Sequence, residues 1–175
     1  MKTTRTKKMV TEALLLGAAI LFQMIEPALP VAVPVPGVKL GLANIIGLIA
    51  LFMYDWKSML KINLMRVLLA SLLRGTFLGT AFWLSLSGVL LSSCAVILMR
   101  KFSKLSVIGL SMASSVFHCL GQILAVSVIY ENIYLISYLP MMWILSIPTG
   151  ILTGILARLT FSRIRKGGIE HDIQL

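Results

Sequence analysis

Acidic residues, histidines and cysteines are all scarce in this chain of 175 residues. None of the six acidic residues forms a DDxxD-like pair able to hold Mg²⁺ against a diphosphate. P-loop, GxSxG and zinc-ligand motifs are absent, which excludes ATP hydrolysis by this chain and the commonest hydrolase and zinc chemistries. Cys94 and Cys119 lie in separate apolar runs without a CxxC spacing, so we expect them to be inert packing residues. The sequence therefore predicts a protein that is not an enzyme and uses neither a cofactor nor a metal.

Apolar residues, in contrast, make up 58% of the chain, charged residues only 13%, and the mean hydropathy is +0.96. A soluble domain carries about twice this charged fraction. Six apolar stretches approach the ~20 residues that a helix needs to cross a bilayer, at about 9–25, 40–53, 58–73, 80–98, 105–129 and 139–161. We therefore predict an all-α membrane protein, a bundle of about six transmembrane helices that forms a single domain over residues 1–175.

The distribution of lysine and arginine predicts the orientation, because cytoplasmic loops retain these residues. With the N-terminus inside, all but three of the 16 cations fall in cytoplasmic segments: the basic leader 1–8, the connection around 57–61, the connection 100–104, and the last span with its tail 162–175. The proline-rich stretch 27–38 then becomes an extended outer loop. Such separate clusters do not form the basic face that nucleic-acid binding requires. We expect a multi-pass protein of the cell membrane with both termini in the cytoplasm.

The three remaining cations, Lys39, Arg66 and Arg74, are candidates for ligand binding. Arg66 lies near the middle of the third span, where a charge costs roughly 2.5–3.5 kcal/mol on insertion scales and therefore faces protein or water. Asn63 lies one turn earlier on the same helix face, and Arg74 lies two turns later. Either these residues bind an anionic ligand, or Arg66 braces helices and Arg74 reaches to the interface.

A stripe of polar residues marks the fifth span. Ser111, Ser115, His118 and Gln122 follow the spacing i, i+4, i+7 and i+11, which places them on one helix face. Lipid offers no hydrogen-bond partners, so this stripe must face other helices or a cavity. His118 and Gln122 fall in the outer half of the span, where they would either join helices or contact a ligand.

The residues around the proline-rich loop are polar as well. Glu26 ends the first span, and Lys39 and Asn44 lie at the start of the second. Glu26 and Lys39 would either pair at the rim, where an exposed ion pair contributes little, or belong to a site. The outer ends of the first, second, third and fifth spans each supply a polar group beside this loop, and that convergence favours a ligand site.

Small residues recur at helical spacing in two spans. Ala13 and Gly17, with Ala18, form a small-xxx-small patch on the first span, and Gly150 and Gly154 form GxxxG on the sixth. Such patches allow helices to approach closely, either within the chain or with a partner. Packing within the chain is the default expectation for both patches.

Four sequence blocks together resemble one membrane family: PGVKLGLANIIGLIAL (36–51), RVLLASLLRGT (66–76), HCLGQ (118–122) and PTGILTG (148–154). The family is labelled heptaprenyl diphosphate synthase component I and is also called the Gx transporter family. The resemblance covers about residues 9–160, and the PGVKLGLAN and HxxGQ blocks are its most specific parts. Cys119 stands where the family pattern leads us to expect asparagine.

That family is similar in size and span count to the substrate-binding S components of energy-coupling-factor transporters. The resemblance implies a small molecule held near the outer face under the first loop. It also implies a small-residue patch on the first helix that docks a transmembrane coupling subunit driven by two ATPases. Ala13, Gly17 and Ala18 would match this docking patch, and the proline-rich loop would match the lid. The synthase label conflicts with the missing aspartate motifs.

Two hypotheses follow. The first is an S-component-like transport subunit that binds a small, anionic or mixed polar–aromatic molecule. The residues expected to bind it are Lys39, Asn44, Arg66, His118 and Gln122, with Glu26, Arg74 and Asn63 beside them. The second is a non-catalytic membrane partner of a soluble prenyl diphosphate synthase in isoprenoid quinone biosynthesis, for which the cationic cytoplasmic loops would provide the contact surface.

Overall fold

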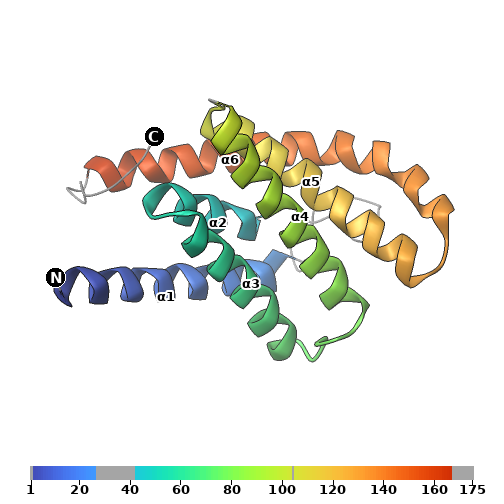
Figure 1. Ribbon diagram of the computed structural model, residues 1–175, viewed down its shortest axis with the longest axis horizontal. Coiled ribbons are helices and arrows are strands. Elements are labelled where there is room, and N and C mark those ends of the chain that lie inside the picture. The colour runs from blue at the N-terminus through green and yellow to red at the C-terminus, as the bar shows by residue number, and fades with distance from the viewer. Residues whose placement is uncertain (1, 27–41, 104, 167–175) are drawn as a thin grey trace.

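The computed structural model describes residues 2–26, 42–103 and 105–166. These residues form six α-helices and one 3₁₀ helix, and there is no strand among them. In chain order the elements are α1 (Lys2–Ile25), α2 (Leu42–Met53), α3 (Trp56–Leu73), α4 (Thr80–Phe102), α5 (Val107–Ile129), η2 (Ile133–Tyr138) and α6 (Leu139–Lys166) (Figure 1). The prediction of an all-α bundle of six helices is confirmed. The predicted outer loop 27–38 and Lys39 lie outside the described residues.

The helices differ from the predicted spans mainly at their polar ends. α1 begins at Lys2, so the basic segment before Met9 is helical, and α6 continues to Lys166. α4 ends at Phe102 and has Arg100 and Lys101 in its last turn. Lysine and arginine are good helix formers and are favourable at the C-terminal end of the helix dipole. Hydropathy alone therefore underestimates how far each helix extends beyond its apolar stretch.

Among the described residues, four segments are long and apolar enough to cross a membrane: residues 5–25, 80–102, 107–129 and 133–163. α2 falls short because its 12 residues extend over only about 18 Å. α3 has 18 residues but includes Lys57, Lys61 and Arg66. The chain is thus a helical membrane protein in which two helices depend on their neighbours for a suitable environment.

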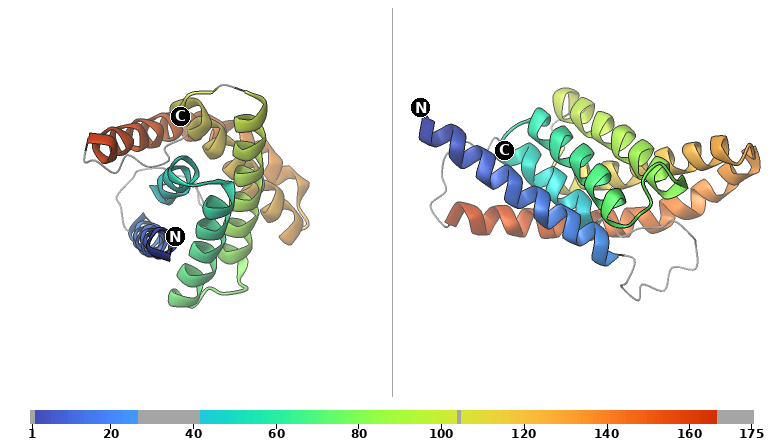
Figure 2. Two further views of the ribbon diagram at one scale, coloured as in Figure 1. Left: turned by 60° about the vertical axis from the view of Figure 1, so that its left-hand side comes forward. Right: turned by 90° about the horizontal axis from the view of Figure 1, so that it is seen from below.

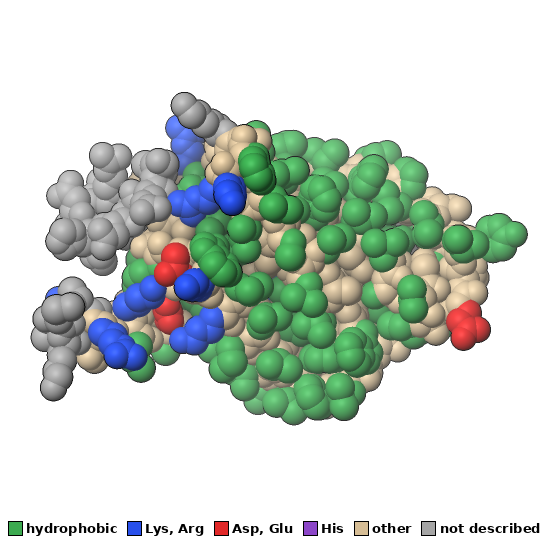
Figure 3. Space-filling view, in the orientation of Figure 1, with side chains coloured by type: hydrophobic (Ala, Val, Ile, Leu, Met, Phe, Trp, Pro, Cys, Tyr) green, Lys and Arg blue, Asp and Glu red, His purple; other side chains and the backbone are tan. Residues whose placement is uncertain are grey.

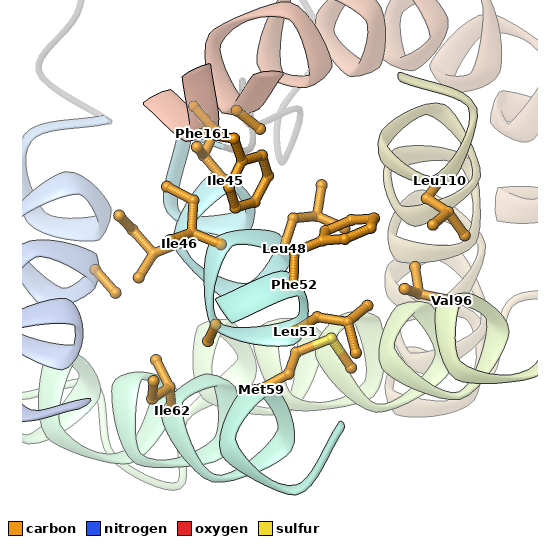
Figure 4. Close-up of a cluster of buried hydrophobic side chains, with 14 residues drawn as sticks. Ile45, Ile46, Leu48, Leu51, Phe52, Met59, Ile62, Val96, Leu110 and Phe161 are labelled. Atoms are coloured by element: carbon orange, nitrogen blue, oxygen red, sulfur yellow. The ribbon is translucent and has the colours of Figure 1, made fainter. Parts of the chain in front are cut away.

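The short helix α2 forms the centre of the bundle. It contacts α1, α3, α5 and α6, and in the end-on view of Figure 2 the other helices surround it. Its side chains from Ile45 to Phe52 are buried and pack against Met59 and Ile62 of α3 and Phe161 of α6 (Figure 4). Because α2 is covered by protein, its backbone does not need to cover the full thickness of the hydrocarbon layer.

Glycines allow the closest helix approaches. A Cβ added at Gly150 or Gly154 of α6 would lie 2.8 Å from a Cα atom of α5, at Met112 or Ile108 respectively. The GxxxG pair thus packs within the chain, as expected by default. Gly121 of α5 makes an equally close approach to the backbone of α4. α5 is therefore tightly held between α4 and α6.

The two ends of the bundle differ in charge. The start of α1 and the end of α6 lie at the same end (Figure 1), and lysine and arginine side chains gather there (Figure 3). This arrangement agrees with an even number of crossings. Which end faces the cytoplasm remains a prediction from the cation distribution.

Candidate functional site

A narrow cavity of about 20 Å³ lies where α1, α2, α3, α4 and α5 meet. Six polar side chains line it, together with three small apolar ones: Gln23, Glu26, Asn44, Arg66, Ser85 and His118. Four of the residues predicted from the sequence, Glu26, Asn44, Arg66 and His118, are thus brought together. The volume is sufficient for about one water molecule.

Arg66 is the central residue of this cavity. Its side chain is only 3% exposed, and its Nη2 donates a hydrogen bond to Asn44 Oδ1 over 3.2 Å. The guanidinium also interacts electrostatically with the Glu26 carboxylate. The Nε atom, however, is buried without a hydrogen-bond partner. A buried intramembrane cation with an unused donor is a strong candidate for a functional group.

Two lining residues, Gln23 and Ser85, were not among the residues predicted from the sequence. Gln23 Oε1 is buried and has no hydrogen-bond partner. The signal was present, because Gln23 lies three residues before Glu26 and therefore on the same face of α1. Ser85 lies on α4 and shares a helix face with Ser92 and Ser93 at the spacing i, i+7 and i+8, so this stripe could have singled it out.

The polar stripe of α5 divides between two neighbours. Ser111 exchanges a 2.9 Å hydrogen bond with Thr153 of α6, and Ser115 lies against Gly150. His118 faces α4 instead, where a Cβ added at Gly88 would lie 2.8 Å from the imidazole ring. Gln122 is 3% exposed but does not line the cavity. Ser111, Ser115 and Gln122 are buried and His118 is half-buried, and only His118 of the four reaches the cavity.

Asn63 and Arg74 lie outside the Arg66 cavity. Asn63 is buried, its Nδ2 donates to Ser93 Oγ of α4 over 3.1 Å, and it packs against Gly47 of α2. Arg74 is exposed at the C-terminus of α3, where it lines a second cavity of about 20 Å³. Both cavities share Gln23, Val67 and Ser85, so they are adjacent.

The predicted docking patch on α1 is only partly exposed. Ala13 and Gly17 are exposed, whereas Ala18 is half-buried and packs against the core. A Cβ added at Gly17 would meet no atom within 4 Å. Within the described chain, α1 contacts α2 and α3, so its face with Ala13 and Gly17 points away from the bundle.

A second polar cluster, which was not predicted, joins α1 to the start of α3. Glu12 is 8% exposed, accepts a 2.7 Å hydrogen bond from Ser58 Oγ, and accepts another from Lys61 Nζ over 3.1 Å. Asp55 caps α3 by accepting from Ser58 N, and it pairs with Lys8 over 3.1 Å. Burial raises the pKa of the Asp55 carboxyl, but the bonds from Ser58 and Lys8 outweigh it and hold this pKa below its usual value.

An apolar groove of about 670 Å³ lies on the surface between α4 and α5. Cys94 lines it and is exposed, so the expectation of a packing role is wrong for Cys94, although Cys119 is buried as expected. Cys94 therefore lies on the exposed side of α4. Without convergent polar groups this groove has nothing to orient a specific ligand.

Over residues 15–160 the sequence matches the family described as heptaprenyl diphosphate synthase component I. The chain belongs to this family. The resemblance of the sequence blocks to the component I family is thereby confirmed, whereas the further likeness to S components remains a prediction. No curated protein and no solved structure matches the chain.

Proposed function

We propose that this member of the component I family is the non-catalytic membrane partner of a soluble prenyl diphosphate synthase. The observation that carries the proposal is the family match over residues 15–160, because the family is described as one component of such a synthase. The helical membrane fold supports it: this chain would supply an anchor, and a soluble partner would supply the chemistry.

The acidic side chains support a non-catalytic role. A prenyl diphosphate synthase needs paired carboxylates to hold Mg²⁺ on a diphosphate. Among the described residues, Glu12 and Asp55 accept hydrogen bonds from Ser58 and from lysines. We therefore assign the chemistry to the partner.

The basic end of the bundle supplies a suitable contact surface. Exposed cations there come from the first, third, fourth and sixth helices: Arg5, Lys7, Lys57, Lys61, Lys101, Arg158 and Arg163. Trp56 and Phe102 are exposed beside them, at 48% and 77%. With this end in the cytoplasm, the surface would attract an acidic soluble partner and steer its approach.

Cell fractionation tests the proposal. In cells that contain this chain, prenyl-elongation activity should sediment with the membranes. In cells lacking the chain, it should move to the soluble fraction and return to the membranes when the gene is restored. Charge reversal of Lys57 and Lys101 should release the activity in the same way. Activity that stays in the membrane pellet without this chain would contradict the anchoring role.

A second candidate function is favoured by the Arg66 cavity: an S-component-like subunit that binds a small molecule and docks a coupling subunit through α1. Arg66, Glu26 and Asn44 would contact the ligand, and the exposed Ala13 and Gly17 face would meet the partner helix. Mass spectrometry of the purified protein tests this candidate by identifying co-purified small molecules. Protein that carries no ligand and needs no energising module would count against it.

A further inference from the structure

The charged side chains that line the Arg66 cavity indicate the class of ligand that it would accept. Among the described lining residues, Arg66 is basic, Glu26 is acidic, and His118 is the third titratable side chain. Arg66 and Glu26 are both more than nine-tenths buried, at 3% and 7% exposure, and they interact electrostatically. The described lining thus supplies one basic and one acidic side chain, in a medium that penalises an excess of charge of either sign.

We infer that this cavity binds a small zwitterion, a molecule with one anionic group and one separate ammonium group. The inference rests on the second candidate function and deepens it. A simple anion would leave the occupied cavity with a net negative charge, and a simple cation would leave it with a net positive charge. A zwitterion adds no net charge to the cavity, and it offers its anionic group to Arg66 and its ammonium group to Glu26.

The unused hydrogen-bonding atoms fit the same class of ligand. Arg66 Nε is a buried donor without a partner, and Gln23 Oε1 is a buried acceptor without a partner. A carboxylate accepts from the first, and an ammonium group donates to the second. The remaining walls, Ala43, Val67 and Val89, are small and apolar, and they suit a short hydrocarbon body between the two charged groups.

The size of the cavity sets a condition on binding. About 20 Å³ holds one water molecule, so any organic ligand requires the walls to move. The adjacent cavity has the same volume and shares Gln23, Val67 and Ser85 with the first. Displacement of the Gln23 side chain would join the two spaces. The ligand would then gain room without separation of the tightly packed α4 and α5.

Four probes of similar size test the inference on the purified full-length chain in lipid nanodiscs: glycine, acetate, methylammonium and acetamide. Dissociation constants come from ligand-observed NMR titrations. Glycine should bind about tenfold tighter than each of the other three, a difference of about 1.4 kcal/mol. Tighter or equal binding of acetate or acetamide would overturn the inference. Failure of all four probes to bind would also overturn it, because the cavity would then hold water only.

Charge variants sharpen the test. Glu26→Gln leaves a net positive cavity and should shift the preference from glycine to acetate. Arg66→Gln should shift it to methylammonium. The control variant Glu131→Gln changes an exposed residue and should keep the wild-type ranking. If a cavity variant fails to fold, the order of affinity of the four probes for the wild-type chain still decides whether the inference holds. The outcome of these titrations does not change the expected fractionation of synthase activity, so the zwitterion inference and the proposed anchoring function can fail separately.

Discussion

Replacement of Gly121 by alanine tests the packing that holds α4 against α5. An added Cβ would lie 2.6 Å from the Ser87 carbonyl oxygen and 2.8 Å from Gly88 Cα. Both are backbone atoms, so no side-chain rotation can relieve the contact and the helices must separate. The same crossing positions His118 beside the Arg66 cavity. Gly121→Ala should therefore lower stability and disturb the cavity wall.

Gly17→Ala is the matched control, because a Cβ there meets nothing within 4 Å. Both replacements exchange glycine for alanine inside a helix and gain a similar helix propensity of up to about 1 kcal/mol. The difference in stability between the two variants therefore isolates the cost of overpacking, which is about 1–3 kcal/mol. For a chain of this size that corresponds to a gap of roughly 2–12 °C in melting temperature.

The assay is thermal unfolding of the two variants and the wild type in the same detergent, followed by tryptophan fluorescence. Gly121→Ala should melt below the wild type, and Gly17→Ala at or above it. Equal melting temperatures for the two variants would refute the close α4–α5 approach. A low value for Gly17→Ala would instead show that a helix of another chain covers the exposed face of α1.

Three further predictions follow from the other clusters. Glu12→Gln should lower stability by about 1–3 kcal/mol, since Ser58 and Lys61 lose a buried partner, whereas Glu131→Gln at an exposed site should have little effect in the same melting assay. Because the pKa of Asp55 is lowered in the folded protein, its carboxylate stabilises the fold fully at pH values above the unfolded-chain pKa of about 3.9, and this stabilisation is lost as the pH falls through the folded-state pKa. The stability of Asp55→Asn should therefore depend less on pH in this acidic range. A pH dependence equal to that of the wild type would show that Asp55 is not its source. In a background without native cysteines, a cysteine at 79 or 131 should react with an impermeant reagent from outside intact cells, and one at 55 or 103 should not; the reverse pattern would invert the predicted orientation.

Much of the fold follows from the sequence because lipid imposes strict rules. Six apolar stretches predicted six helices, and the central position of the second explains how so short a helix is accommodated. Polar groups within the spans were expected to face inward. Glu26, Asn44, Arg66 and His118 come together for that reason, although they belong to four different helices.

Other features depend on helix rotation and crossing, which hydropathy does not encode. Glu12 meets Ser58 across 46 positions of sequence, and this contact requires a particular rotation of α1 against α3. Gln122 lies on the same predicted stripe as His118, yet only His118 lines the cavity. Side-chain identity predicted burial here, but it did not predict which neighbour each residue would face.

The most direct test of the proposed function is the composition of the complex purified from native membranes through a tag on this full-length chain. The account predicts a soluble prenyl diphosphate synthase with paired aspartate motifs, recovered in stoichiometric amount and lost when Lys57 and Lys101 are reversed in charge. Recovery of a transmembrane coupling subunit with two ATPases, and no synthase, would contradict it.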